Sequence, residues 1–281
     1  MKINSKTMTL SENKGVLYLT YNRLCDVDFI RHAFSTKHGG VSTGEWTSMN
    51  FAFSRGDKPE NVIENYKIFS DAAGFQYSSL VTSSQDHNTF VRPVTKAECG
   101  IGIWREKDIQ SVDALITNEA GVTLVTHYAD CTPLFFVDTV NKAIGLAHAG
   151  WRGTVGKIGQ KVIEKMSELY NSQPKDIIVC IGPAISKCCY EVSEDCAENF
   201  YNLSNTENEK YETDNFIFPI ENNKFMIDLL EANKQIVKNA GILEENIVKS
   251  DLCTMCNSDL LWSHRATKGH RGTMCAFMCI K

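Results

Sequence analysis

One cysteine and two histidines stand at the ends of apolar, strand-like runs between residues 80 and 150. Cys131 and His148 are 17 residues apart, and His87 ends an earlier run. Short runs rich in β-branched and aromatic residues and bounded by Gly or Pro are typical of buried strands. Strand ends are rigid and meet at one edge of a sheet, where catalytic groups are commonly mounted. We therefore expect these three side chains to lie together.

Two imidazoles and one thiolate form the ligand set of a catalytic zinc ion. Such a site has three protein ligands of N/S type and an open position for water, whose pKa falls toward roughly 7. The three residues are far apart in the sequence, and a single His or Cys is more often structural, so the spacing alone is a weak signal. The hypothesis is a zinc site made by His87, Cys131 and His148.

Copper fits this sequence less well than zinc. A blue-copper centre also uses two His and one Cys, but it adds an axial ligand such as Met, and the residues after Cys131 offer no nearby His or Met. A multicopper oxidase also needs a His-rich cluster, whereas this chain has seven His and no His-x-His pair. Laccase chemistry is therefore not expected.

A glycine-containing turn after His148 is a candidate anion site. Gly150, Arg152, Gly153 and Thr154 lead into a predicted helix. Converging backbone N–H groups, a Thr154 cap and the Arg152 guanidinium would suit a phosphate or carboxylate. An ordinary turn with a surface arginine explains the same motif.

Three further groups could contact an anionic substrate. Gly39 and Gly40 could form a second backbone nest, although most such pairs are only turns. Arg265 and Arg271 follow another strand-like run, with solvated arginines as the alternative interpretation.

The cysteine pattern does not indicate a disulfide framework. The chain has eleven Cys, irregularly spaced and including the adjacent Cys188 and Cys189, and most are expected to be small core residues. Cys253 and Cys256 have the spacing of a zinc half-site or a redox pair. Because no second pair exists to complete a structural zinc site and no thioredoxin-like context surrounds them, we interpret them as reduced, structural thiols.

The composition indicates one soluble domain over residues 1–281. Of its residues 43% are hydrophobic, the formal net charge is -5, and no linker or repeat divides the chain. No apolar run approaches the roughly 18 residues of a spanning helix, and the polar N-terminus lacks the apolar core of a signal peptide, so we expect a cytoplasmic protein. The partner is expected to be a small molecule rather than nucleic acid or membrane, and the protein a monomer or small homo-oligomer.

Hydrophobic periodicity predicts three helices among strands. The first opens at a capping-box-like Asp57, the second at Thr154, and the third covers residues 225–240. Further strands are predicted at residues 16–20, 80–83, 89–94, 176–181, 260–264 and 273–280. Residues 202–215, which are rich in Asn, Glu and Thr, are expected to form a mobile surface loop. Together these elements predict an α/β fold of mixed sheets covered by helices.

Taken together, the motifs resemble the laccase-domain (YfiH-type) family over nearly the whole chain. The segments that carry the resemblance are residues 32–42, 85–87, 113–117, 129–133, 147–153, 181–185, 228–229 and 253–254. The Ala-Asp-Cys motif ending at Cys131 and the His-Ala-Gly-Trp-Arg-Gly motif beginning at His148 are its most specific parts.

The resemblance implies one α/β domain of layered mixed sheets flanked by helices, similar to toxin deamidases with a Cys/His pair. It implies phosphorolysis of adenosine, inosine, guanosine and methylthioadenosine, and deamination of adenosine. Members were first described as multicopper polyphenol oxidases, and some bacterial members are described as peptidoglycan editing factors that remove a misincorporated serine.

The family's metal triad falls on His87, Cys131 and His148, which strengthens the zinc hypothesis. Two segments depart from the family pattern: Asp86 and Asn88 flank His87, and Lys37 replaces an arginine. The C-terminal double arginine is also reduced, to Arg265 and Ala266. Lysine replaces a planar fork of donors by a point charge, so these changes bear on substrate preference rather than on the metal ligands.

The leading mechanistic hypothesis is attack of zinc-bound hydroxide on C6 of adenosine, with Asp130 or Asp86 transferring protons. Phosphorolysis would use phosphate held by Arg152 and the turn of residues 150–154. In an alternative enzyme, Cys131 is a nucleophile activated by His148 and hydrolyses an amide in a wall precursor. A third hypothesis is a protein whose His/Cys cluster binds a metal or partner and serves stability only.

Overall fold

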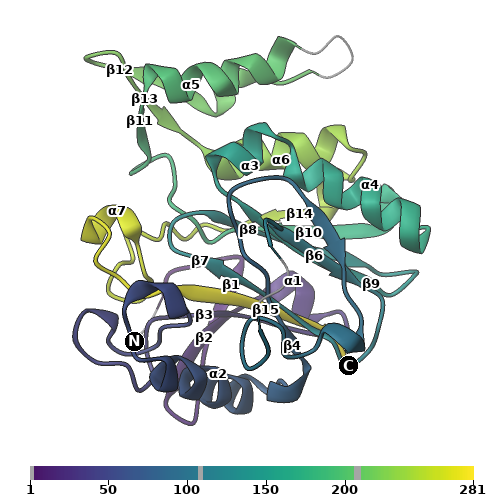
Figure 1. Cartoon of the computed structure of the whole chain (residues 1–281). Coiled ribbons are helices and arrows are strands. Elements are labelled where there is room, and N and C mark those ends of the chain that lie inside the picture. The colour runs from purple at the N-terminus through teal and green to yellow at the C-terminus, as the bar shows by residue number, and fades with distance from the viewer. Residues whose placement is uncertain (1–2, 107–109, 206–209) are drawn as a thin grey trace.

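The computed structural model describes residues 3–106, 110–205 and 210–281 of the chain. In these residues, two six-stranded mixed sheets pack face to face and helices cover their outer faces (Figure 1). A small third sheet stands beyond one helical layer, beside a further helix. The predicted α/β domain of layered mixed sheets is confirmed.

The first sheet has the strand order β1-β2-β3-β15-β7-β4. Neighbouring strands are antiparallel, except that β4 and β7 are parallel. Its strands are β1 (Met8–Asn13), β2 (Val16–Tyr21), β3 (Ile30–Ser35), β4 (Leu80–Val81), β7 (Thr123–Tyr128) and β15 (Met274–Ile280).

The second sheet has the strand order β14-β10-β8-β9-β6-β5. Its three central pairings are antiparallel and its two edge pairings are parallel. Its strands are β5 (Val91–Pro93), β6 (Ala114–Thr117), β8 (Thr132–Asp138), β9 (Ala143–Ala149), β10 (Ile177–Ile181) and β14 (Ile247–Lys249).

Both sheets are covered on two faces, and β15 shows how the sequence achieves this. Met274, Ala276 and Met278 enter the core between the sheets, whereas Cys275 and Phe277 enter the core under α2 (Pro59–Ala73). Because successive side chains of a strand point to opposite faces, a strand buried on both faces must be apolar throughout. That is the composition of this strand.

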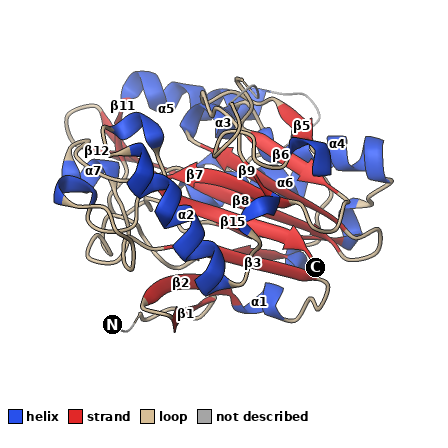
Figure 2. Ribbon diagram, turned by 60° about the horizontal axis from the view of Figure 1, so that its bottom comes forward, coloured by secondary structure: helices blue, strands red, loops and turns tan. Residues whose placement is uncertain are grey.

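Helix α2 lies across the outer face of the first sheet (Figure 2). All four residues of its predicted apolar stripe are buried, as expected: Val62, Tyr66, Phe69 and Ala73. The predicted capping box at Asp57 is wrong. Lys58 is the N-cap, and the Asp57 carboxylate accepts hydrogen bonds from the Lys58 N–H and from the Asn61 side chain.

The second predicted helix is divided into two helices, and the first of them begins at Trp151, before the predicted start at Thr154. They are α3 (Trp151–Val155) and α4 (Ile158–Tyr170), separated at Lys157, whose φ of +57° is left-handed. The break reorients the chain, so Ile158, Val162 and Met166 are buried against the second sheet while Leu169 is 42% exposed.

The third predicted helix begins four residues too early. Residues 224–227 form β13 (Lys224–Ile227), which pairs with β11 (Glu191–Ser193) and β12 (Ile217–Ile220) in the small sheet. Asp228 then caps α6 (Leu229–Asn239) by accepting a hydrogen bond from the Glu231 N–H. The small sheet shares an apolar core with α5 (Glu194–Tyr201) and one face of α6.

Two further predictions are wrong in part. Residues 260–262 are apolar because they are buried in the core, but they form no strand, and Ser263 then caps α7 (His264–Thr267). Within 202–215, residues 202–205 and 213–215 form 3₁₀ turns and Tyr211 is buried, while residues 206–209 lie outside the described part of the chain.

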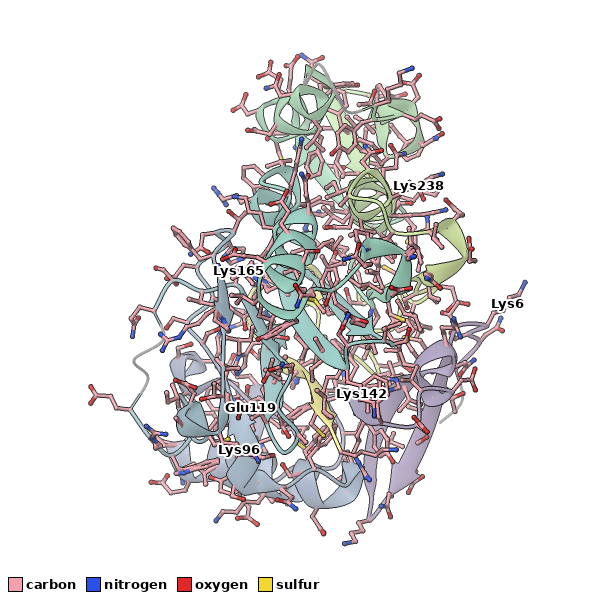
Figure 3. All side chains as sticks on the ribbon, turned by 90° about the vertical axis from the view of Figure 1, so that its right-hand side faces the viewer. Lys6, Lys96, Glu119, Lys142, Lys165 and Lys238 are labelled. Atoms are coloured by element: carbon pink, nitrogen blue, oxygen red, sulfur yellow. The ribbon has the colours of Figure 1, made fainter. Side chains whose placement is uncertain are left out.

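The remaining predicted strands, at residues 16–20, 80–83, 89–94, 176–181 and 273–280, overlap β2, β4, β5, β10 and β15. One more short helix, α1 (Asn22–Cys25), follows β2. Charged side chains such as Lys6 and Lys238 lie on the outside of the molecule (Figure 3). Among the described residues, no helix has both the length and the apolar composition needed to cross a membrane.

Candidate metal centre

His87, Cys131 and His148 converge at one end of the second sheet. Cys131 directly precedes β8, and His148 lies in the neighbouring β9, opposite Pro133. His87 comes from the loop between β4 and β5. The Cys131 sulfur is 3.8 Å from His87 Nε2, the two imidazole centroids are 4.8 Å apart, and the three potential ligand atoms lie within 4.8 Å of one another.

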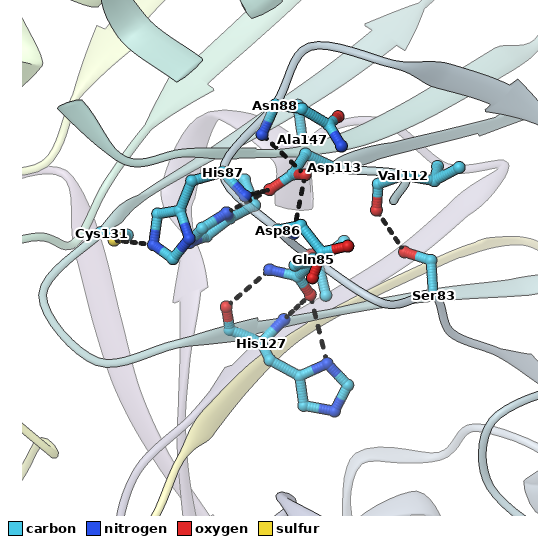
Figure 4. A network of polar contacts seen from close by, with 12 residues as sticks. Ser83, Gln85, Asp86, His87, Asn88, Val112, Asp113, His127, Cys131 and Ala147 are labelled. Atoms are coloured by element: carbon cyan, nitrogen blue, oxygen red, sulfur yellow. Dashed lines mark hydrogen bonds and ion pairs between the residues drawn. The ribbon is translucent and has the colours of Figure 1, made fainter. Parts of the chain in front are cut away.

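A fully buried carboxylate, Asp113 at the start of β6, orients two of these three residues (Figure 4). One carboxylate oxygen accepts a hydrogen bond from His148 Nδ1 at 2.7 Å and one from the His87 backbone N–H at 3.1 Å. The other oxygen accepts from the backbone N–H groups of Asp86 and Asn88. Three successive N–H groups can converge on one carboxylate because His87 is left-handed, with φ +62°.

Cys131 and His148 each favour the charged form of the other. Burial raises the pKa of the Cys131 thiol, but the nearby His148 and His87 outweigh burial and lower it to about 6. Burial lowers the pKa of His148, but Cys131 and Asp113 outweigh it and raise it to about 9. The metal-free protein therefore holds a thiolate–imidazolium pair near neutral pH.

Gly150 lies against two of the three side chains. A Cβ at this position would be 2.8 Å from His87 Cδ2 and 3.1 Å from the Cys131 sulfur. Glycine is therefore needed here for close approach of the backbone, not for an unusual φ angle.

The three residues form part of the wall of a cavity of about 610 Å³, a size that suits a small organic ligand. Parts of residues 51–55, 83–87, 102–105 and 127–131 make up the wall, with His148, Arg271 and Thr273. The cavity thus lies between segments that the two large sheets position.

Three arginines give this cavity a cationic side. Arg55 and Arg105 are exposed, while Arg271 is only 8% exposed. Burial and the neighbouring Arg55 lower the pKa of Arg271 to about 10, and Arg271 donates hydrogen bonds to the Gly272 carbonyl and the Thr273 hydroxyl. An anion bound here would relieve the repulsion between two guanidinium groups. The sequence offered Arg271 only as one of several arginines, and it gave no signal for Arg55.

The predicted anion turn begins beside the three residues at Gly150 but does not line the cavity. Among the described residues that line the cavity, none belongs to the turn of residues 150–154. Gly150 is the N-cap of α3, so the prediction that Thr154 caps the helix is wrong, and the buried Thr154 hydroxyl accepts a hydrogen bond from Asn233. Gly153 is a buried residue of α3. The Arg152 guanidinium lies over the Trp151 ring, 4.2 Å from its centroid.

Asp130, Arg265 and Asp86 differ in what their side chains and backbone contact. Both Asp130 carboxylate oxygens accept hydrogen bonds, from the Thr254 hydroxyl at 2.6 Å and from the Arg265 backbone N–H at 2.7 Å. Asp86 lines the cavity, and its carboxylate accepts a hydrogen bond from the Ser111 hydroxyl. Of the two predicted proton-transfer groups, Asp86 is the one that faces the cavity.

The glycine pair at positions 39 and 40 does form a nest. Both backbone N–H groups donate to the Ser48 hydroxyl, which therefore occupies the position of an anion. The neighbouring Lys37 donates to the Ser258 carbonyl at 2.5 Å and lies near the Trp262 ring.

The interpretation of Cys253 and Cys256 needs correction. They have a second pair of partners, because Cys188 and Cys189 lie beside them and the four sulfurs are within 4.8 Å of one another. The adjacent cysteines come from a distant segment and lack the Cys-x-x-Cys spacing, so the sequence pattern did not connect them. No disulfide bond joins any of the eleven cysteines, all of which lie in the described part of the chain.

Comparison with known proteins agrees with this architecture. A purine nucleoside phosphorylase of Bacillus subtilis, YlmD, is 35% identical over 250 residues, which cover 88% of this chain and 87% of YlmD. The crystal structure of YlmD from Geobacillus stearothermophilus has a TM-score of 0.90 at 32% identity and covers 98% of this chain and 99% of that one. The crystal structure of Bacillus licheniformis protein YfiH also has a TM-score of 0.90, at 30% identity, and covers 98% of this chain and 100% of that one.

The layered sheets and the His/Cys/His group define a class of laccase-like domains. The family model described as multi-copper polyphenol oxidoreductase laccase matches residues 31–281, and this chain belongs to that family. The resemblance found in the sequence motifs is thereby confirmed.

Replacing Asp113 by Asn tests the role of the buried carboxylate. We expect zinc affinity to fall roughly 10–100-fold, because His148 loses the acceptor that orients its ring. The free energy of unfolding should fall by about 1–3 kcal/mol. Zinc titration against a competing chelator measures the affinity, and thermal or denaturant unfolding measures the stability.

Asp138→Asn is the matched control, because Asp138 is also fully buried and accepts hydrogen bonds from the Val140 and Asn141 N–H groups, away from the three residues. It should lower stability and leave zinc affinity intact. Equal zinc affinities for both variants would contradict the role assigned to Asp113.

The thiolate–imidazolium pair predicts an unusual pH dependence for Cys131 alkylation in metal-free protein. The thiolate is the reactive form, so the iodoacetamide rate should rise with pH through about 6 and then level off. A free small-molecule thiol, with a pKa of roughly 8.5, serves as the reference. Mass spectrometry of the Cys131 peptide gives the rate, and a midpoint at the reference value would show that the pair does not form.

Proposed function

We propose that this protein is a zinc-dependent purine nucleoside phosphorylase that acts on adenosine and methylthioadenosine and also deaminates adenosine. The observation that carries the proposal is the convergence of His87, Cys131 and His148 on a 610 Å³ cavity with a cationic side. The relation to YlmD, named a purine nucleoside phosphorylase, supports the choice of substrates.

The donor set fits zinc. Two imidazole nitrogens and a thiolate with a lowered pKa are ligands that zinc prefers, and three protein ligands leave a fourth position toward the cavity. The hydrogen bond from His148 Nδ1 to Asp113 leaves Nε2 of that ring available as a ligand, the arrangement common around catalytic zinc. When bound here, zinc supplies a Lewis acid and lowers the pKa of a water molecule toward roughly 7.

Other residues of the cavity wall bind phosphate, contact the purine and transfer protons. Arg271 and Arg55 hold phosphate, because their guanidinium groups repel one another and line the same cavity as Cys131. The half-exposed Phe53 ring offers an apolar face to the purine. Asp86 transfers protons, since its carboxylate reaches the cavity. We assign phosphate to Arg271 instead of Arg152 because the Arg152 turn is absent from the described wall.

Polyphenol oxidation, which the family's description names, has weaker support. In the described part of the chain, the groups of three or more metal-binding side chains are the His/Cys/His group and the four cysteines. Neither contains the several histidines of a multicopper cluster.

A thiol amidohydrolase acting on a wall precursor is the second candidate. The observation in its favour is that Cys131, His148 and Asp113 are arranged like a nucleophile, its base and an orienting carboxylate. The pKa of the Cys131 thiol is lowered and that of His148 is raised, as in such a pair. Dependence on metal separates this candidate from the zinc enzyme.

Cys131→Ser provides that separation. For the zinc enzyme, we expect bound zinc at this site to be lost and phosphorolysis of adenosine to fall by more than roughly 100-fold, beyond the effect of an outer contact. Adenine release measured by chromatography, together with metal analysis of the same sample, gives both quantities. Cys25→Ser, at an exposed thiol, is the matched control.

Treatment of the wild-type enzyme with a chelator completes this test. Loss of activity on zinc removal and its return on zinc addition support phosphorolysis at a metal centre. No phosphorolysis of adenosine by the zinc-loaded protein, combined with metal-independent amide hydrolysis that Cys131→Ser abolishes, would favour the thiol amidohydrolase.

Arg271→Gln and Arg152→Gln together locate the phosphate. Arg271→Gln should raise the KM for phosphate roughly 10–100-fold, the loss of about 1.5–3 kcal/mol for hydrogen bonds to a charged group. Phosphate-independent conversion of adenosine to inosine should change less. Arg23→Gln, on the exposed side of α1, controls for the loss of one positive charge. A larger KM effect from Arg152→Gln would move the phosphate to the turn that the sequence predicted.

A further inference from the structure

Four cysteines from two distant segments meet below the small sheet. Cys188 and Cys189 lie in the loop between β10 and β11, and Cys253 and Cys256 lie in the loop after β14. The Cys256 sulfur is 3.6 Å from the Cys188 sulfur and 3.4 Å from the Cys189 sulfur. All four sulfurs lie within 4.8 Å of one another.

These separations match a tetrahedron of thiolates around an ion. A disulfide bond would bring two sulfurs to roughly 2.05 Å. Zinc–sulfur bonds of roughly 2.3 Å at tetrahedral angles place the sulfurs roughly 3.8 Å apart. The separations of the Cys256 sulfur from the Cys188 and Cys189 sulfurs are close to the distance between two thiolates on one zinc ion and far longer than a disulfide bond.

Cys253 has the backbone surroundings of a zinc-binding thiolate. The Ser186 N–H donates to its sulfur at 3.4 Å, and the Met255 and Cys256 N–H groups are also directed at it. The N–H groups of the second and third residues after Cys253 thus stabilise negative charge on its sulfur.

We propose that Cys188, Cys189, Cys253 and Cys256 bind a structural zinc ion, separate from the His/Cys/His centre. Four cysteine ligands close the coordination shell, as in structural zinc sites, whereas the three ligands at Cys131 leave a position open. The ion adds to the contacts between the two loops, which include the short bridge between Ala184 and Cys253.

The position of this cluster gives the ion a role at the other centre. Thr254, between the cluster cysteines, donates to the Asp130 carboxylate, and the Ile185 N–H donates to the Asp130 carbonyl. Asp130 has a left-handed φ of +85° and directly precedes Cys131. A zinc ion that fixes both loops therefore also fixes the turn that presents the Cys131 sulfur.

Metal content of single and double variants tests the proposal independently of any activity. Protein produced with zinc should contain about two zinc ions per chain, and Cys131→Ser should contain about one. Cys131→Ser combined with Cys256→Ser should contain none, and Cys131→Ser combined with Cys25→Ser should keep its ion. Cobalt in place of zinc in Cys131→Ser should give the strong thiolate charge-transfer absorption of a tetrahedral site with four sulfurs.

Absence of zinc from Cys131→Ser, or its retention in the Cys131/Cys256 double variant, would overturn the proposal. A wild-type mass two units below the reduced value, with Cys256 linked to Cys188 or Cys189, would also overturn it. Failure of the Cys131 centre to bind zinc would instead lower the wild-type content to one ion, and Cys256→Ser would remove that ion. The fates of the two sites are thus distinguishable.

Alkylation of the wild-type protein covers the case in which a variant does not fold. Cys188 and Cys256 are exposed, as is Cys25. In zinc-loaded protein, iodoacetamide should modify the two cluster thiols at least roughly tenfold more slowly, relative to Cys25, than in chelator-treated protein, because metal-bound sulfur is a weaker nucleophile. Equal relative rates in the zinc-loaded and the chelator-treated protein would show that no ion protects the cluster.

Discussion

The Asp113 carboxylate accepts four hydrogen bonds without any exposure to solvent, from His148 Nδ1 and from three backbone N–H groups around His87. A buried charge is stable only when it is paired and fully hydrogen-bonded. Asp113 therefore requires both histidine segments to be in place, and each of them depends on Asp113 for its orientation. The conformation of the loop between β4 and β5 therefore depends on the Asp113 carboxylate as well as on the sequence of the loop.

The residues that line the cavity come from both large sheets. The second sheet and its loops supply Cys131 and His148, whereas Arg271 precedes β15 of the first sheet and Arg55 lies in the segment before α2. Metal ligands and cationic wall therefore come from different layers. The packing of Met274 and Met278 against residues such as Phe135 sets the distance between the two.

Periodicity in the sequence predicted the layers well because burial on both faces leaves a continuous apolar run, as in β8 and β15. It placed Phe225 in a helix because a short strand and a helical turn have similar composition, and only pairing with β11 and β12 decides between them. His87, Cys131 and His148 were recognisable because ligand chemistry restricts the residue types. Arg55 and the partners of Cys253 were not, since their roles depend on contacts between distant segments, for which the sequence has no local signal.

The three candidate metal ligands and Asp113 all lie between residues 87 and 148, whereas Arg55 and Arg271 of the cavity wall lie far outside this stretch. Contacts between residues close in sequence lose less entropy when they form, and they form earlier in folding. The centre can therefore be assembled from one compact stretch of the chain before the surface that recognises a ligand is complete. Evolution can in turn vary that surface without disturbing the His/Cys/His group.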